Sequence, residues 1–211
     1  MSNRHKTDLP VIEVEQHQVR EVLRCLLHTI IFNRALGLVK PQEVESELFD
    51  VTYVRCGDEA VDSKVEEKIS AFCSWIDRHP GKRGQVSLLF YESRRKQANW
   101  LGIPQEERLY WEQWCINTAI VPSSVSLHEQ SSPVTGVRGA RQARLQLGVE
   151  EALRTILTSV NEHKDHIPAV TSSYALTFPF DITITGEGGV MFGLDAFKRM
   201  IMHTSPPPVL S

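Results

Sequence analysis

The feature that most constrains the fold is a pair of strand-like segments joined by a short polar stretch. Residues 86–92 (VSLLFYE) are almost entirely apolar, and residues 109–121 (LYWEQWCINTAIV) are rich in aromatic and β-branched side chains. A short apolar run is typical of a central strand, and aromatic, β-branched segments are typical of strands in general. Because the stretch between the two segments is polar, we expect an antiparallel hairpin with a loop at its tip.

The alternation in residues 109–121 predicts which side chains share a face, since successive side chains of a strand point to opposite faces of the sheet. On one face we expect Tyr110, Glu112, Trp114, Ile116, Thr118 and Ile120. On the other face we expect Trp111, Gln113, Cys115, Asn117 and Ala119.

Trp100 lies between these two segments, in a stretch without helical or strand periodicity. Leu101 and Ile103 follow it, and burying a large apolar side chain is worth about 1.5–3 kcal/mol. Either the loop folds back onto the domain's own core, or a partner covers it, and loop tryptophans are common anchors of protein–protein interfaces. The residues alone leave both alternatives open. They make Trp100, Leu101 and Ile103 the candidate partner-binding residues.

The remaining segments predict an α+β fold. Apolar residues recur at helical spacing in residues 19–32, 61–76 and 140–164, whereas residues 48–56 and 178–185 are strand-like. In the third helix we expect these side chains to face inward: Leu147, Leu153, Ile156, Leu157 and Val160. The order of the elements favours an antiparallel sheet with the helices mainly on one face.

The length of 211 residues is typical of one domain, which we place at residues 1–204. Residues 122–139 are rich in Ser, Pro, Val and Gly without any period, which predicts a flexible surface loop. A short apolar element at 192–201 forms a variable C-terminal segment, and residues 205–211 predict a disordered tail.

The composition favours a cytoplasmic protein. The first ten residues lack the apolar core of a signal peptide, and no apolar run reaches the roughly 18 residues that a membrane-spanning helix needs. Four widely spaced cysteines lie in apolar patterns: Cys25, Cys56, Cys73 and Cys115. Such spacing predicts buried free thiols in a reducing compartment, not a disulfide framework or a zinc site.

No catalytic or metal-binding constellation is evident. GxSxG and GxxxxGK[ST] are absent, and the GEGG at 186–189 lacks the last glycine of GxGxxG. His163 and His166 offer two metal ligands without a third, which is more typical of a solvated, polar helix C-terminus. Three carboxylates without a nucleophile or histidine beside them we interpret as solvated charges: Glu106, Glu107 and Glu112. We therefore expect no metal, no cofactor and no enzymatic activity, with an unrecognised enzyme site as the competing hypothesis.

The basic run beside Trp100, RRKQANW at 94–100, is similar to a small platform for single-stranded nucleic acid. Such platforms normally stack several bases on several aromatic side chains along a basic groove. One tryptophan and three cations on a chain of formal net charge −3 favour a solvated hairpin tip instead. A nucleic-acid-binding or unrelated protein-binding α+β module remains the alternative function.

Seven blocks of the chain, in order, resemble the autophagy-related protein one-hundred-and-one family, the small HORMA-domain subunits of the autophagy-initiating kinase complex. The blocks are EVLRCLLHTIIFNRALG, FDVTYVRCGD, LLFYE, ERLYWEQWCIN, NEHKDHIP, FPFDITI and FGLDAFKRM. The resemblance covers nearly the whole chain and is closest to plant-type members. LYWEQW soon after a loop tryptophan is its most specific part.

This resemblance implies a HORMA domain, in which three helices pack against an antiparallel sheet and the C-terminal segment is mobile. It implies a non-enzymatic scaffold that binds and stabilises the HORMA domain of autophagy-related protein thirteen at the autophagosome assembly site. The third helix, or the first helix and its exit, would face that partner. It also implies a single, open-like conformation that wraps no peptide under the C-terminal segment.

The family also carries a protruding WF finger, a loop tryptophan and a nearby phenylalanine that recruit downstream autophagy factors. Its tryptophan matches Trp100, and its phenylalanine matches best to Leu101, which is a departure from the pattern. A leucine keeps the apolar contact but loses the roughly 0.5–1.5 kcal/mol specific to an aromatic pair. The resemblance therefore implies a recruiting role for Trp100 and Leu101, with Ile103 beside them.

Overall fold

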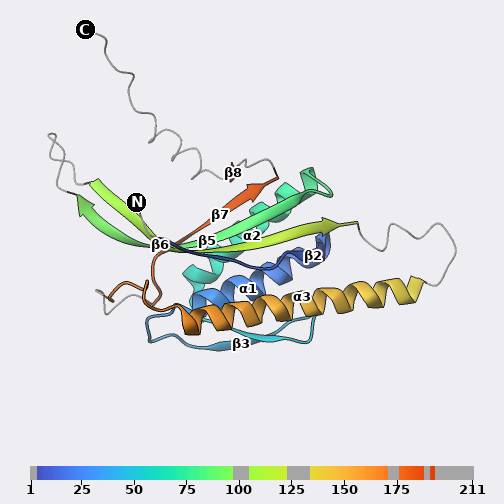
Figure 1. Ribbon diagram of the computed structural model, residues 1–211, viewed down its shortest axis with the longest axis horizontal. Helices are drawn as coiled ribbons and strands as arrows, with labels where there is room; N and C mark the ends of the chain where they lie inside the picture. Colours follow the sequence, from blue (N-terminus) through green and yellow to red (C-terminus); the bar gives the residue numbers. More distant parts are fainter. Residues whose placement is uncertain (1–3, 97–104, 123–133, 171–175, 188–190, 193–211) are drawn as a thin grey trace, which may run out of the picture.

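A computed structural model describes residues 4–96, 105–122, 134–170, 176–187 and 191–192. Within these ranges three long helices lie against a sheet whose central strands form a long hairpin (Figure 1). The elements are β1 (His5–Asp8), β2 (Ile12–Glu15), η1 (Gln16–Gln18), α1 (Val19–Asn33), β3 (Gln42–Glu45), β4 (Thr52–Arg55), α2 (Glu59–Arg78), β5 (Arg83–Lys96), β6 (Gln105–Val121), α3 (Val134–Glu162), β7 (Phe180–Gly186) and β8 (Met191–Phe192).

The main sheet has the strand order β1-β6-β5-β7-β8, and β2 also pairs with β6. Strand β5 is antiparallel to both β6 and β7, which confirms the predicted hairpin and the mostly antiparallel sheet. Strands β1 and β2 instead pair with β6 in parallel. Sequence patterns missed these two strands because each has only four residues, too few to establish a period.

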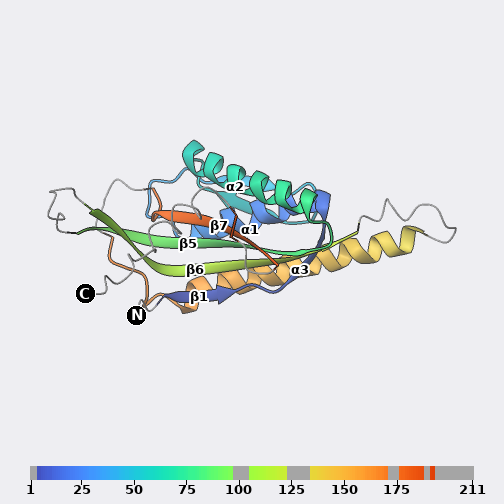
Figure 2. The ribbon, with the colours of Figure 1, turned by 90° about the horizontal axis from the view of Figure 1, so that it is seen from above.

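The three helices cover one face of this sheet, as predicted, and α1 lies between α2 and α3 (Figure 1). Figure 2 shows the same layers from above, with α2 lying along β5 and β7. Asp58 caps the start of helix α2, and its carboxylate accepts a hydrogen bond of 2.8 Å from the backbone N–H of Val61. Glu59 and Asp62 in its first turn interact favourably with the helix dipole.

Two predicted boundaries were wrong. The segment predicted as a strand at 48–56 is a strand only at Thr52–Arg55, where it pairs with β3 in a separate two-stranded sheet. The third helix begins at Val134 and not at residue 140. Gly136 and Gly139 lie in its first turns, and glycine costs about 1 kcal/mol against alanine in a helix, which made the segment look non-helical. Residues 123–133 of the predicted loop, and the predicted tail, lie outside the described residues.

The four cysteines are free thiols, as predicted, with Cys73 half-buried and the other three buried. Burial raises the pKa of Cys25 to about 12 and that of Cys56 to about 11, so both stay protonated near neutral pH. None of the helices in the described ranges combines the length and the apolar character needed to cross a membrane.

Candidate functional site

The β5–β6 hairpin extends past the helices at one end of the domain (Figure 1). Its two strands remain paired out to Lys96 and Gln105, the described residues on either side of 97–104. The predicted partner-binding residues Trp100, Leu101 and Ile103 fall in this stretch, outside the described residues. The structure describes the paired ends of β5 and β6 that lead to this stretch, from Tyr91 to Lys96 and from Gln105 to Tyr110, which we call the arm.

A β-bulge lies at the base of this arm. Phe90 pairs with Glu112, but the next residue of β5, Tyr91, pairs with Tyr110, so Trp111 has no counterpart. The extra residue turns Trp111 toward the core, where its ring centroid lies 5.6 Å from that of Phe90. Tyr110 is turned to the opposite face. The predicted faces of Trp111 and Tyr110 were therefore wrong, because a bulge interrupts strict alternation.

Beyond the bulge toward Val121 the alternation holds. The side chains that were predicted to share a face are buried in the core: Trp114, Ile116, Thr118 and Ile120. The same period continues across the sheet in β7, where Phe180, Ile182 and Ile184 are buried. From Trp114 to Ile120 the sheet thus presents a mainly apolar face to the helices.

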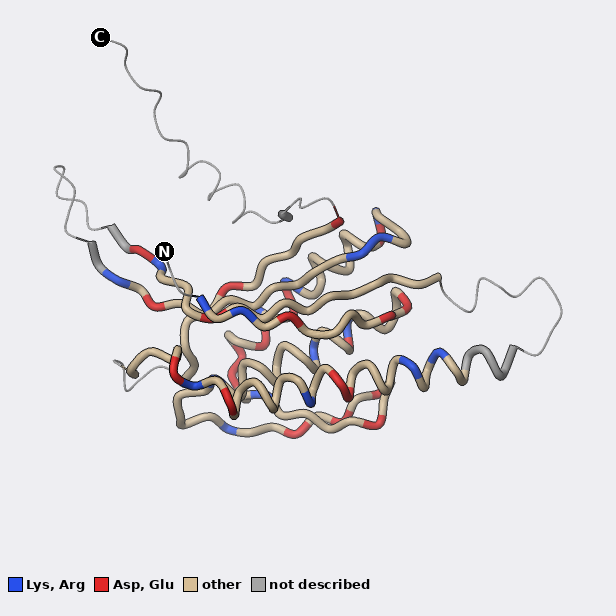
Figure 3. Tube along the Cα trace, in the orientation of Figure 1, with Lys and Arg blue, Asp and Glu red and all other residues tan. Residues whose placement is uncertain are grey.

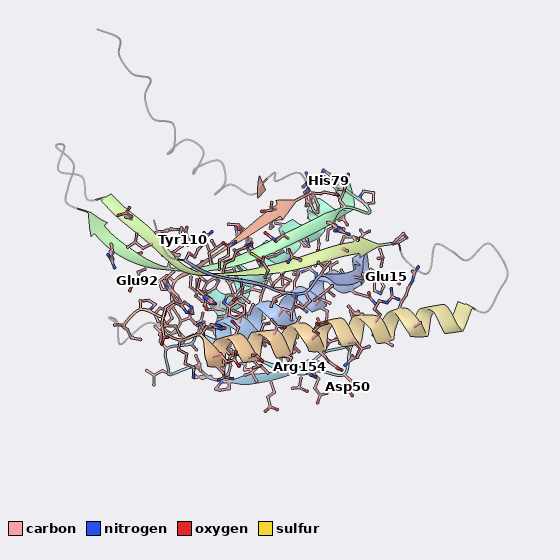
Figure 4. All side chains as sticks on the ribbon, in the orientation of Figure 1. Glu15, Asp50, His79, Glu92, Tyr110 and Arg154 are labelled. Carbon is pink, nitrogen blue, oxygen red and sulfur yellow. The ribbon has the colours of Figure 1, made fainter. Side chains whose placement is uncertain are left out.

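On the outer face, a polar and aromatic cluster joins the arm to β7. The Arg108 guanidinium lies 2.9 Å from the carboxylate of Asp181, and the hydroxyl of Tyr110 donates to the same carboxylate at 2.7 Å. Arg108 also stacks over the ring of Tyr91, with 4.7 Å between its Cζ and the centroid. Figure 4 shows Tyr110 and Glu92 where the arm leaves the domain. This cluster joins the base of the arm to β7.

On the inner face, the arm's base rests on a buried ion pair. Nε and one Nη of Arg34, at the end of α1, donate to the two carboxylate oxygens of Glu112 at 2.9 and 2.7 Å. The side chains are only 4% and 0% exposed. Burial alone would raise the pKa of Glu112, but the hydrogen bonds and charge of Arg34 outweigh it and hold that pKa below its usual value. The prediction that Glu112 is a solvated charge was wrong.

His166 approaches the same carboxylate, with Nε2 at 2.9 Å from Oε1 of Glu112. Its ring stacks on that of His5 in β1, with 4.4 Å between the centroids. The prediction of a solvated helix end is therefore wrong for His166, whose side chain is only 15% exposed. Among the described residues, no group of three or more metal-ligating side chains is arranged to hold a metal ion.

The solvent-facing side of α3 carries two exposed leucines. Leu147 is 65% exposed and Leu157 is 48% exposed, so the prediction that both face inward was wrong. The prediction is confirmed for Ile156 and Val160, and Leu153 is partly buried against the core. The inward stripe at helical spacing consists of Leu145, Val149, Ala152, Ile156 and Val160. Leu157 borders a shallow surface depression together with Leu153, Arg154 and Asn161. Sequence periodicity did not predict the outward position of Leu147 and Leu157, because α3 has more apolar residues than its inward face can hold.

The comparisons with known proteins agree with the resemblance seen in the sequence. The family model described as autophagy-related protein 101 matches residues 11–174. Autophagy-related protein 101 of Arabidopsis thaliana is 42% identical over 211 residues, covering 96% of each chain. The Schizosaccharomyces pombe protein of the same name is 26% identical over 87% of this chain and 88% of its own. The Homo sapiens protein is 26% identical over 59% of this chain and 62% of its own. A family match over more than half of the chain, on a fold of this kind, shows that the chain belongs to the autophagy-related protein 101 family.

Proposed function

We propose that this autophagy protein is a non-enzymatic scaffold of the autophagy-initiating kinase complex. In this role it pairs with the HORMA domain of autophagy-related protein thirteen, stabilises it, and recruits downstream autophagy factors. It acts in the cytoplasm at the autophagosome assembly site, and no metal, cofactor or nucleic acid takes part. The observation that supports the proposal is an α+β domain with two separate features on its outside, the exposed leucines of α3 and the projecting hairpin.

The pairing surface in this proposal is the outer side of α3. Leu147 and Leu157 are ten residues apart, which places them about 15 Å apart along the helix axis and roughly 80° apart around it, at roughly 1.5 Å of rise per residue and about 3.6 residues per turn. Both fall within the roughly 100° wide stripe that a partner can cover, and burying each is worth about 1.5–3 kcal/mol. The first half of α3 carries the basic residues Arg141 and Arg144, whereas acidic and basic residues are mixed in its second half (Figure 3). Neither sign therefore dominates over the helix as a whole. We therefore expect the pairing to depend on the leucines and only weakly on salt.

Size-exclusion chromatography with light scattering tests this pairing, using the full chain alone and mixed with the partner's HORMA domain. The unchanged chain should form a one-to-one complex, and Leu157→Asp should weaken it at least tenfold. Val170→Asp is the matched control, because Val170 is a similarly exposed apolar residue (57%) outside α3. Two separate peaks for the well-folded unchanged chain would refute the pairing.

The recruiting surface in this proposal is the loop that the arm holds out. The paired ladder to Lys96–Gln105, the Arg108–Asp181 cluster and the buried Arg34–Glu112 pair all restrain the arm. Trp100→Ala should leave the melting temperature unchanged and weaken the capture of downstream factors by the assembled complex. Leu38→Ala is the control, since Leu38 is 92% exposed on a different loop. A fall of several degrees in melting temperature for Trp100→Ala would show that Trp100 caps the core instead.

A further inference from the structure

Three imidazoles from two distant parts of the chain meet at the edge of the sheet. His5 lies on β1, and His163 and His166 follow the end of α3. The ring centroid of His5 is 4.4 Å from that of His166, with the planes at 20°, and 5.0 Å from that of His163. Stacked neutral imidazoles attract at such separations, whereas two imidazolium ions repel.

The charged groups around this histidine cluster (His5, His163 and His166) supply little negative charge. Glu112 of β6 bonds to His166, but its carboxylate is already paired with both donor groups of Arg34. The pair of Arg34 and Glu112 carries no net charge. Apart from burial, the groups that act on the pKa of His5 are His166, His163, Glu112 and Arg34. Two basic and two acidic residues line the surface depression beside His5 and His163, namely Lys6, Arg154, Asp8 and Glu151, so their formal charges cancel. Protons added to the cluster would therefore meet no net negative charge.

Strand β1 has few other attachments. It pairs with β6 over four residues and is the edge strand of the sheet. Toward α3 it is joined by a contact of 3.3 Å between the hydroxyls of Thr7 and Ser159. Four residues of edge strand form a segment of low local stability, so a modest change in the cluster shifts its opening equilibrium.

We propose that the histidine cluster is a pH-sensitive latch, which holds β1 against α3 when its imidazoles are neutral and releases β1 when they are protonated. Release would uncover the hydrogen-bonding edge of β6 at the register positions of Glu112 to Cys115. An uncovered strand edge can accept a strand from another chain. The latch is independent of the α3 leucines and of the hairpin tip, so it does not rest on the proposed partners.

The direction of the pH effect follows from His5. Burial and the neighbouring His166 and His163 lower the pKa of His5 below its ordinary value of 6.5. The unfolded or released segment therefore binds a proton at a higher pH than the latched one. The stabilisation by the latch is fully present above the unfolded pKa, and it is lost as the pH falls through the folded pKa.

Hydrogen–deuterium exchange of the full chain at about pH 7.5 and about pH 5.5 tests the latch, with rates expressed as protection factors to remove the intrinsic pH effect. We expect the protection of residues 5–9 to fall on the order of tenfold at the lower pH, with β5 and β7 unchanged. His5→Phe keeps an aromatic ring in the stack but cannot be protonated, so this variant should lose the pH response. His17→Gln, which removes an exposed histidine next to Glu15, should keep it.

If His5→Phe folds poorly, His163→Gln tests the latch instead, because it removes one imidazole without changing β1. This variant should show a smaller change in the protection of β1 between the two pH values. Constant protection of β1 across this pH range would refute the latch. A fall in the protection of β1 in His5→Phe as large as in the unchanged chain would also refute it. A uniform loss over all elements would also refute it, because it would point to global unfolding through buried His28, whose pKa burial lowers as well.

Discussion

The buried ion pair between Arg34 and Glu112 at the base of the arm should contribute strongly to stability, and removing Arg34 tests this. Arg34→Met leaves the fully buried carboxylate of Glu112 without its guanidinium and without two hydrogen bonds of 2.9 and 2.7 Å. Breaking one half of a buried ion pair costs about 3–5 kcal/mol, since an uncompensated charge stays in the interior. For a chain of this size, that loss lowers the melting temperature by about 6–20 °C.

Urea unfolding followed by tryptophan fluorescence measures the loss, because Trp75 and Trp114 are buried in the core. The double variant Arg34→Met with Glu112→Met is the matched control. It replaces both charges by apolar side chains, and we expect it to recover most of the lost stability. A double variant as unstable as the single one would refute the argument, as would a cost below about 1 kcal/mol for Arg34→Met.

The same pair predicts a dependence on pH. In the unchanged protein the folded pKa of Glu112 is lowered, so its stabilisation is present above the unfolded pKa and is lost as the pH falls through the folded pKa. In Arg34→Met, burial is opposed only by the smaller effects of Trp114 and His166, so the pKa of Glu112 should rise, and acid should neutralise the carboxylate. The difference in stability between the two proteins should therefore shrink between neutral pH and about pH 4. A difference that stays constant would contradict this.

Three further predictions concern packing, capping and thiol chemistry. Gly84→Ala should destabilise the protein by about 1–3 kcal/mol in urea, because a Cβ there would lie 2.5 Å from the ring of Phe72, whereas Gly139→Ala meets open space. Asp58→Ala should lose about 1 kcal/mol from the start of α2 and Asp58→Asn much less; equal losses in a thermal melt would argue against the cap. Cys25 should resist alkylation at neutral pH until urea unfolds the chain, and rapid native labelling seen by mass spectrometry would contradict its burial.

The parts of the fold that were predicted correctly are those that local periodicity reports. The buried faces of α1 and of β7 repeat every few residues, and the two central strands lie next to each other in sequence. The strands that were missed, β1 and β2, are short and pair with β6 more than 100 residues away. A four-residue segment carries too little pattern to show which distant strand it will join.

The sequence by itself determined the α+β class, the hairpin, the side chains that share a face from Trp114 to Ile120, the free thiols and the family. Only the tertiary structure decided which side chains surround the arm's base. Arg34 and Glu112 are 78 residues apart, and their pairing depends on where α1 ends relative to β6. The bulge at Trp111 and the outward turn of Leu157 depend likewise on how neighbouring elements pack. Periodicity shows which residues share a face, but the partner of that face is set by contacts between segments far apart in the chain.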